Sequence, residues 1–279
     1  MIVEKAHAKI NVCLHVLGKR TDGYHTLESI MVPLELHDTL ELTVSPTDTI
    51  ALACDDPPTA NPEDNLVMRV AQAMQTRFSL RGFQIHLKKR IPVASGLGGG
   101  SADAAAALRG LNRLFNLGLS LDALAEIGLA FGADIPFCVF ERPAFVQGIG
   151  EQLTFLPDKH SVPVWLGTPN IRLSTAQVFS HVTADDMSVP LLDDLLRAWA
   201  QADDSQLSTL CANSLTRAAE RAEPAFAAFR RQMARRLATT VTMTGSGPTV
   251  FVIGPDAETV NHDDFADLSF RFSRLTNTL

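Results

Sequence analysis

The stretch from Pro92 to Ala107, PVASGLGGGSADAAAA, sets four glycines within five positions, directly before an alanine-rich segment. The glycines and the residue after them are Gly96, Gly98, Gly99, Gly100 and Ser101. Serine is a favoured N-cap residue and alanine a strong helix former, so Ser101 is predicted to cap a helix. Glycines let a backbone turn sharply and approach a ligand closely. Because a helix N-terminus offers free N–H groups and partial positive charge, the pattern predicts a cradle for an anion, most often phosphate.

Other glycine-rich motifs fit this stretch less well. A Walker loop requires Gly-Lys-Ser/Thr after its spacer, and no lysine follows the glycines here. A dinucleotide-binding fingerprint requires a third glycine where Ser101 stands, and the sequence lacks the His-Arg-Asp loop of protein kinases. The structural alternative is a flexible loop before a core helix, but a single turn rarely needs four glycines.

Composition limits the kinds of partner. With 279 residues, of which 46% are hydrophobic, the chain can bury a sizeable core in one large or two modest domains. The net charge of −7 disfavours a nucleic-acid binder. No leader peptide or membrane-length apolar run is found, so no membrane partner is expected. The cysteines have no metal-binding spacing and are typical of reduced thiols in a cytoplasmic protein: Cys13, Cys54, Cys138 and Cys211.

Helices and strands are predicted to be mixed along the whole chain, which indicates an α+β protein. The expected strands are 2–17, 32–44 with a turn near His37-Asp38, 82–92, 162–169 and two strands within 240–254. The expected helices are 65–78, 121–131, 189–200 and a helical region 205–233 that Pro224 splits in two. The sequence changes in character after Pro157, so we divide the chain into a first domain, 1–157, and a second domain, 158–279.

Three stretches carry a resemblance that covers nearly the whole chain. AHAKIN (6–11) is a lysine-bearing N-terminal strand, GLGGGSADAA (96–105) is the glycine loop before a helix, and TGSGPTVF (244–251) is a C-terminal glycine turn. In this order they resemble the family of small-molecule kinases named for galactose, homoserine, mevalonate and phosphomevalonate. The resemblance implies a two-domain fold, with the active site in the cleft between an N-terminal ATP-binding domain and a C-terminal substrate-side domain.

Within that family the chain resembles the branch that acts on a cytidine diphosphate-linked polyol. The stretches that carry this likeness are AKINVCLHVLGKRTDGYHTLESIMVPLELHDTL (8–40), GADIPFCV (132–139), GIGEQLTFLP (148–157) and STAQVF (174–179). They imply an ATP-dependent kinase of the non-mevalonate isoprenoid route, a monomer or weak homodimer, whose small-molecule partners are ATP, Mg²⁺ and that polyol. Two alternatives stay open: a sibling kinase for homoserine or a mevalonate, and a non-catalytic relative that binds nucleotide. The chain departs from the family pattern at Ala102, where serine is frequent, and at Ser214, where an acidic residue is usual.

Lys9 and Asp134 are the expected catalytic residues. Lys9 stands in an otherwise apolar strand, where a charge must face water or a partner. As a partner of Asp134 it would keep that carboxylate ionised and polarise the acceptor hydroxyl, while Asp134 would act as the base. On sequence alone, Lys9 is as readily an edge-strand lysine in solvent, and Asp134 an ordinary loop aspartate or helix cap.

The acceptor is expected to contact residues far apart in the sequence. Asn11 shares a strand face with Lys9, because alternate strand residues point the same way. Tyr24, the only tyrosine, is expected to stack on the cytosine, with His25 reading the base edge and Phe179 covering the other face. The remaining expected contacts are Thr175, Gly245, Ser246 and Gly247, the last three as a nest of N–H groups. The alternatives are core packing of the two aromatic rings and a simple hairpin turn at 245–247.

The nucleotide is expected to contact the glycine cradle, which comprises Gly96, Gly98, Gly99, Gly100 and Ser101. The resemblance adds Asn65 and Leu66, near the adenine, and Lys89 is expected near a phosphate. From the residues alone, Asn65 is equally a helix cap and Lys89 a solvated strand end. Mg²⁺ would bridge the ATP phosphates, and the sequence offers no obvious protein ligand for it.

Overall fold

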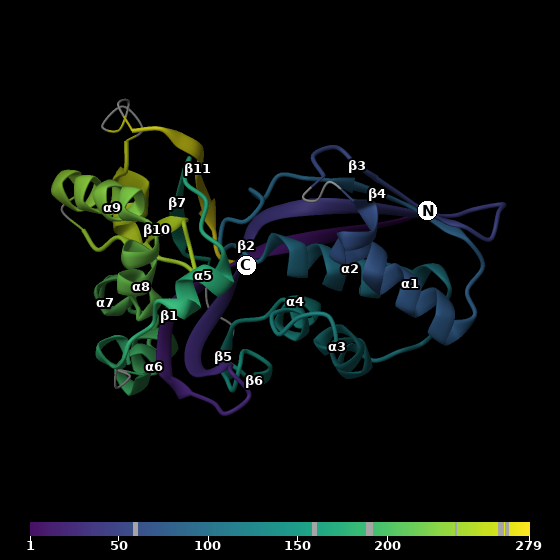
Figure 1. Ribbon diagram of the computed structural model, residues 1–279, viewed down its shortest axis with the longest axis horizontal. Coiled ribbons are helices and arrows are strands. Elements are labelled where there is room, and N and C mark those ends of the chain that lie inside the picture. Colours follow the sequence, from purple (N-terminus) through teal and green to yellow (C-terminus); the bar gives the residue numbers. More distant parts are fainter. Residues whose placement is uncertain (58–60, 158–160, 188–191, 238, 262–264, 266–267) are drawn as a thin grey trace. The chain divides into compact units, whose positions relative to one another are not determined.

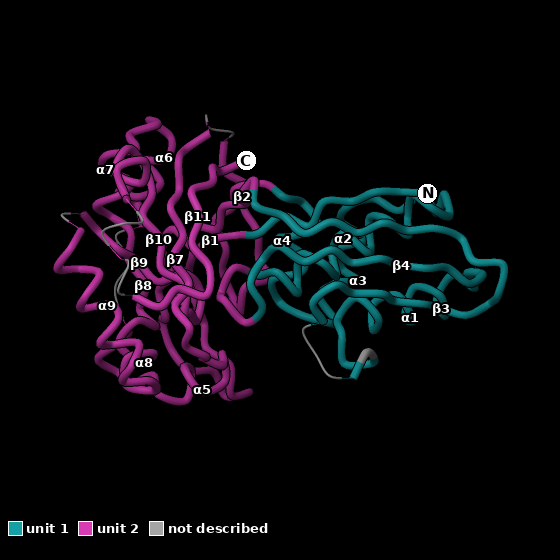
Figure 2. Tube along the Cα trace, turned by 90° about the horizontal axis from the view of Figure 1, so that it is seen from above, with its two compact units in different colours: residues 1–8, 36–93, 98–141 teal, residues 9–35, 94–97, 142–279 magenta. Residues whose placement is uncertain are grey.

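The computed structural model describes residues 1–57, 61–157, 161–187, 192–237, 239–261, 265 and 268–279 (Figure 1). The chain forms two compact units (Figure 2). Unit 1 comprises residues 1–8, 36–93 and 98–141, and unit 2 comprises residues 9–35, 94–97 and 142–279. This differs from the predicted division at residue 157, because strands β1 (Ile2–Lys19) and β2 (His25–Val44) each contribute to both units.

Unit 1 combines a sheet with a set of helices. Strand β4 (Phe83–Lys88) pairs antiparallel with the end of β2 and parallel with β3 (Ile50–Cys54). Buried and less buried residues alternate along β4, as expected for a strand with one face in the core. The helices pack against one another through α2: α1 (Leu66–Phe78), α2 (Gly99–Leu114), α3 (Leu121–Leu129) and α4 (Ile135–Phe140), with a 3-10 turn at Pro62–Asp64 before them.

Two local predictions in unit 1 are wrong. Helix α2 begins at Gly99 with Gly98 as its N-cap residue, at a φ of 72°, so Ser101 lies inside the first turn and does not cap it. Glycine adopts this left-handed conformation without strain, which allows the helix to start earlier than the serine. The turn near His37-Asp38 is not formed either, because β2 runs without a break and Asp38 is fully buried within it.

Unit 2 is built on a second sheet. Within the described residues its strands lie in the order β11 (Phe270–Asn277), β7 (Pro163–Pro169), β10 (Val250–Ile253) and β9 (Thr242–Met243), all antiparallel. Strand β7 is almost wholly buried, as a central strand should be. Helices α8 (Leu215–Ala222) and α9 (Pro224–Arg236) pack against this sheet and share one apolar core with it (Figure 1).

The other strands of unit 2 belong to the sheet that contains β1 and β2. Strand β5 (Ala144–Gln147) pairs with β2 at residues 29–31 and with β6 (Gln152–Phe155), and β8 (Ala212–Asn213) pairs parallel with β1. The remaining helices are α5 (Thr175–Ser180), α6 (Leu192–Ala200) and α7 (Asp204–Leu210), with 3-10 turns at Ala184–Asp186 and Pro255–Thr259. Residues 189–191 of the predicted helix 189–200 lie outside the described residues.

The predicted helical region 205–233 is interrupted twice. The break at Pro224 is confirmed, because this proline is the first residue of α9. A second break, at residues 211–214, was not expected. There the chain pairs with β1 instead: the Ser214 N–H donates to Leu14 O at 2.8 Å, and Ser214 Oγ accepts from the Val16 N–H at 3.3 Å.

Candidate active site

The start of α2 in unit 1 gathers several of the predicted nucleotide contacts. A Cβ on Gly100 would lie 3.7 Å from Leu66 Cδ1, and a Cβ on Gly99 would lie 3.0 Å from Ile91 Cγ2 and 3.5 Å from Lys89 Nζ. Glycine at position 99 therefore lets the first turn of α2 lie close to Ile91, whereas a side chain at position 100 would make only an ordinary contact with α1. Asn65 caps α1, with its Oδ1 accepting from the Val67 N–H at 2.9 Å, so the capping interpretation is confirmed for its side-chain oxygen. Contact of these residues with ATP stays a prediction.

Lys89 has a different environment from the one expected. Its side chain is 5% exposed, and its ammonium group donates to Asp38 Oδ2 and, at 2.6 Å, to Asp103 Oδ2. The solvated strand end is therefore wrong for this lysine. Asp38 Oδ1 also accepts the Arg90 N–H and the Ile91 N–H, which fixes the chain just before the glycines. We define Asp38, Lys89 and Asp103 as the anchor cluster of the cradle.

The anchor cluster is electrostatically unbalanced, because two carboxyl groups share one ammonium group. Burial is the largest cause that raises the pKa of Asp103, to about 7; Lys89 opposes the shift and Asp38 adds to it. Burial disfavours the charge of Lys89, but the two carboxylates outweigh burial and raise its pKa. Asp103 Oδ1 is buried and finds no hydrogen-bond partner among the described residues.

Unit 2 brings Lys9 together with both glycine-rich stretches. Lys9 is 4% exposed, so the solvent-facing interpretation is wrong, and its Nζ donates to Asn11 Oδ1 at 2.8 Å. A Cβ on Gly245 would lie 3.0 Å from Gly96 O, 3.4 Å from Lys9 Nζ and 3.6 Å from Asn11 Oδ1. A Cβ on Gly96 would lie 2.5 Å from Thr244 O. Gly96, which is predicted to contact the nucleotide, therefore packs against the turn that is predicted to contact the acceptor.

The turn at 244–247 leads on to the predicted cytosine contacts. Ser246 Oγ lies 2.8 Å from Thr175 Oγ1, the first residue of α5. Phe179, one helical turn later, has its ring 5.2 Å from that of His25, at an interplanar angle of 33°. Phe179 also packs against the core of unit 2, so its two interpretations are compatible. The structure thus places these residues side by side in one unit, although 154 residues separate His25 from Phe179 in the sequence.

Tyr24 and His25 are the two residues of the 20–25 turn that are predicted to contact the cytosine. Tyr24 is 61% exposed, so it does not fold back onto the core. Its N–H donates to Asp22 Oδ1 at 3.1 Å, and its carbonyl oxygen accepts from the Arg20 N–H at 2.8 Å, which shapes the turn that carries the ring. Burial, followed by the charge of Lys19, lowers the pKa of His25. A neutral imidazole offers one donor and one acceptor to a base edge.

Asp134 belongs to unit 1, where it precedes α4 at the N-cap position. It is half-buried and makes no capping hydrogen bond through its side chain. The apolar segment that follows it, Ile135–Phe140, is a buried short helix. The structure therefore disfavours the simple capping role. The pairing of Asp134 with Lys9, which belongs to unit 2, stays a prediction.

Sequence reasoning missed residues that hold the site in place. Asn213 Nδ2 donates to Met243 O at 2.7 Å and to Gly245 O at 2.8 Å, and Asn213 Oδ1 accepts from the Leu215 N–H at 2.9 Å. One side chain thus fixes the start of α8 to the turn at 244–247. Asp38 and Asp103 were missed as well. No distinct local signal was present for Asp38, because the strand-like stretch 32–44 also contains Glu35 and Glu41.

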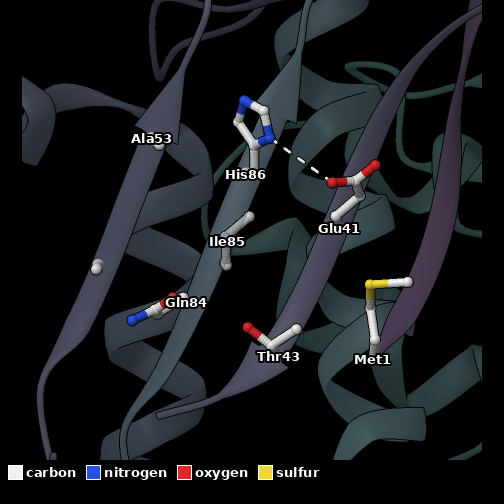
Figure 3. A pocket seen from close by; sticks show the side chains of 8 residues that line it. Met1, Glu41, Thr43, Ala53, Gln84, Ile85 and His86 are labelled. Carbon is white, nitrogen blue, oxygen red and sulfur yellow. Dashed lines mark ion pairs between the residues drawn. The ribbon is translucent and has the colours of Figure 1, made fainter.

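A small pocket in unit 1 lies apart from these residues. It has a volume of about 190 Å³ and opens beside β2, β3 and β4 (Figure 3). His86 at its rim pairs with Glu41, Nδ1 to Oε2 at 3.7 Å, and its Nε2 lies 2.8 Å from Asp55 Oδ1. No residue predicted for catalysis or binding lines it among the described residues, so we do not assign it to the active site.

The described residues contain no metal-binding cluster, no helix suited to span a membrane and no disulfide bond. No group of three or more His, Cys, Asp or Glu side chains among them is placed to hold a metal ion. No helix in the described part of the chain is both long enough and apolar enough to cross a membrane. All the cysteines are free thiols, and burial raises the pKa of Cys13 to about 12.

Comparison with known sequences identifies close relatives of this chain. Residues 65–142 match the model of the GHMP kinases N terminal domain. A 4-diphosphocytidyl-2-C-methyl-D-erythritol kinase of Geobacillus sp. (strain WCH70) is 39% identical over 279 residues, covering 100% of this chain and 92% of that protein. The enzyme of the same name from Bacillus pumilus (strain SAFR-032) is 41% identical over 251 residues, covering 90% of this chain and 87% of that protein.

Solved structures agree with the sequence comparison. A crystal structure of 4-(cytidine 5'-diphospho)-2C-methyl-D-erythritol kinase superposes with a TM-score of 0.80 at 29% identity and covers 99% of both chains. The homoserine kinase of Cytophaga hutchinsonii superposes with a TM-score of 0.75 at 16% identity, covering 99% of this chain and 93% of the other. At that identity the second likeness shows the fold alone, and it confirms the predicted α+β kinase fold.

Proposed function

We propose that this chain, which belongs to the family of 4-diphosphocytidyl-2-C-methyl-D-erythritol kinases, transfers the γ-phosphoryl group of ATP to the hydroxyl on carbon 2 of 4-diphosphocytidyl-2-C-methyl-D-erythritol. It is an ATP-dependent kinase of the isoprenoid precursor pathway that proceeds through methylerythritol phosphate. The sibling kinases share its fold at 12% to 16% identity, whereas the relatives with this activity reach 41%.

The observation that carries the proposal is a continuous row of residues in unit 2. It runs from Lys9 to Gly245, through Ser246 and Thr175 to α5, and then to the paired rings of Phe179 and His25. One end offers a buried ammonium group, and the other offers an aromatic face beside a neutral imidazole. A polyol linked through a diphosphate to cytidine has a hydroxyl at one end and a flat base at the other. A smaller alcohol such as homoserine has no group for the aromatic end.

Phosphoryl transfer depends mainly on positioning and on stabilising negative charge. The N–H groups at the start of α2 are assigned to the ATP phosphates, because a glycine N-cap leaves them open to a ligand. The Lys9 ammonium group is assigned to the developing charge at the acceptor hydroxyl. Asp134, which makes no capping bond through its side chain, is assigned the role of accepting the hydroxyl proton.

Mg²⁺ is proposed to accompany ATP. The described residues contain no acidic cluster that would hold the ion by itself, so the phosphate oxygens would supply most of its ligands. The hydroxyl of Ser101, in the first turn of α2, is the side-chain oxygen that the cradle offers for the remaining position. The bound ion would neutralise charge on the transferred group.

The proposal is tested by comparing acceptors for the wild-type protein in one ATP-consumption assay. The cytidylated methylerythritol, homoserine and mevalonate are offered at equal concentration, with and without a chelator of Mg²⁺. We expect turnover only with the cytidylated acceptor and only with Mg²⁺ present. Preference for homoserine or mevalonate would reassign the chain to a sibling activity, and no turnover with any acceptor would favour a nucleotide-binding relative.

The substitution Asp134→Asn tests the assigned base. The amide keeps the shape of the carboxylate but does not accept the proton, so kcat is expected to fall about 100-fold or more while ATP affinity is kept. Asp122→Asn is the matched control, because Asp122 is an exposed aspartate in the first turn of α3 in the same unit. Activity of the Asp134 variant within a few-fold of the control would remove Asp134 from this role.

A further inference from the structure

The ammonium group of Lys9 is held by a row of hydrogen bonds that ends at a serine outside the predicted site. Lys9 Nζ donates to Asn11 Oδ1 at 2.8 Å, Asn11 Nδ2 donates to Ser29 Oγ at 2.8 Å, and Ser29 Oγ donates to Cys13 O at 2.6 Å. All three side chains are buried, and Ser29 is 0% exposed. They come from β1 and from β2, where Ser29 pairs with β5.

The chemistry of the groups fixes the direction of every bond in this row. An ammonium group only donates, so the oxygen of the Asn11 amide must face Lys9. The amide nitrogen therefore faces Ser29, whose oxygen accepts one of its protons. The single hydroxyl proton of Ser29 is then available to Cys13 O. The orientation of an amide, usually ambiguous between its oxygen and nitrogen, is thus determined here by its two neighbours.

We propose that Ser29 is a positioning residue for phosphoryl transfer, because it holds the Asn11 amide in the one orientation that accepts a hydrogen bond from Lys9. The proposal rests on the catalytic role proposed for Lys9. The expected contact of Asn11 with the substrate stays a prediction; its side chain links Lys9 to Ser29, and its main-chain N–H donates to Thr244 Oγ1 at 2.9 Å. The same asparagine thus ties the ammonium group to the turn at 244–247.

Loss of the Ser29 hydroxyl removes the acceptor for Asn11 Nδ2. A buried N–H group without a partner is unfavourable, so the amide is expected to shift toward another acceptor and to carry its oxygen away from the Lys9 ammonium group. The ammonium group then has to move, and a displacement of about 1 Å at a reacting centre costs about 100-fold in rate.

The test compares variants of the full-length protein by steady-state kinetics. Ser29→Ala is expected to lower kcat by about 10- to 100-fold and to change KM for ATP by less than about twofold. Ser29→Thr, which keeps a hydroxyl, is expected to retain most of the activity. Ser208→Ala is the matched control: Ser208 is also buried in unit 2 and donates to a main-chain oxygen, Ser205 O at 2.9 Å, within α7.

A double-mutant cycle separates positioning from a purely structural role. If Ser29 acts only through Asn11, then adding Ser29→Ala to Asn11→Ala lowers kcat no further. Should Ser29→Ala fail to fold, Ser29→Cys replaces it, because a thiol of similar size is a weak acceptor and the same loss of kcat is expected.

Three outcomes would overturn the proposal. The first is a kcat for Ser29→Ala within about twofold of the wild-type value. The second is a decrease in kcat for Ser29→Ala that is no greater than the decrease for Ser208→Ala. The third is a double variant in which the effects of Ser29→Ala and Asn11→Ala on kcat add fully. Lys9→Ala, measured in parallel, keeps this result distinct from failure of the proposed function. If Lys9→Ala abolishes turnover while Ser29→Ala does not lower it, only the Ser29 proposal fails. If Lys9→Ala is active, the role of Lys9 fails first.

Discussion

The substitution Asp103→Asn gives a quantitative test of the charge balance within the anchor cluster of the glycine cradle. The carboxyl groups of Asp103 and Asp38 share the single ammonium group of Lys89, so the buried cluster is negative when both carboxyls are ionised. Burial is the main cause that raises the pKa of Asp103 to about 7. The substitution Asp103→Asn removes this charge while an amide oxygen can still accept from Lys89 Nζ.

The direction in which stability changes with pH depends on whether the folded or the unfolded chain holds the proton of Asp103. A carboxyl whose pKa is raised on folding keeps a proton that the unfolded chain has already released, so its contribution to stability is lost as pH rises. For Asp103 the window runs from the ordinary value of 3.8 to about 7. Within this window the free energy of unfolding of the wild type falls by on the order of 1 kcal/mol per pH unit through this group. The variant lacks this titration, so its stability relative to the wild type rises as pH rises.

The measurement is urea denaturation of both proteins at about pH 5, 6 and 7, with the free energy of unfolding obtained by linear extrapolation. We expect the difference between Asp103→Asn and wild type to shift steadily in favour of the variant as pH rises. Asp122→Asn, which changes an exposed aspartate in the same unit, controls for the loss of one surface charge. A difference that is the same at all three pH values would refute the reasoning, because Asp103 would then titrate alike in the folded and unfolded chain.

Further substitutions separate the nucleotide side from the acceptor side. Gly98→Val is expected to weaken ATP binding, since a β-branched residue is strained at a φ of 72°; unchanged ATP affinity in a folded variant would place the phosphates elsewhere. Gly96→Ala is expected to raise KM for the acceptor more than KM for ATP, because its Cβ would meet the 244–247 turn; the reverse ranking would contradict this packing. Tyr24→Ala is expected to lower the affinity for the cytidylated acceptor by about 5- to 150-fold, the range for the loss of one aromatic–base stack. If the wild type binds acceptors with and without the cytidine group equally well, the stack is ruled out. Asn213→Ala frees Met243 O and Gly245 O and is expected to raise KM for the acceptor about tenfold at constant KM for ATP; unchanged acceptor KM would show that the turn holds without it.

The sequence predicted the parts of the site whose signals are local. A run of glycines before an alanine-rich segment is read within a few residues, and α2 does begin there. A tyrosine after a turn-like segment was expected at a loop tip, and Tyr24 is exposed. A lysine in an apolar strand was expected to face water or a partner; Lys9 is buried and donates to Asn11, whereas its expected pairing with Asp134 stays a prediction.

The parts that the sequence did not reveal depend on partners far along the chain. Asp38 looked like a turn residue because aspartate is common in turns, but Lys89, Arg90 and Ile91 lie more than fifty residues later and supply its hydrogen bonds. The unit boundaries were missed for the same reason. A strand such as β2 gives no local sign that its residues 29–31 pair with β5 and its residues 39–44 with β4.

Gly96 and the turn at 244–247 are best understood as one packed feature within unit 2. Gly96 has a φ of 82° and Gly245 a φ of 55°, and a Cβ on either would meet the backbone of the other stretch. These two glycines are therefore required by the close approach of backbone to backbone, independently of any ligand. Gly98, in unit 1, is the N-cap residue of α2 and has a φ of 72°, a conformation that itself favours glycine. The requirement for glycine thus has two physical origins in this chain: close approach of backbone to backbone at Gly96 and Gly245, and the left-handed N-cap conformation at Gly98.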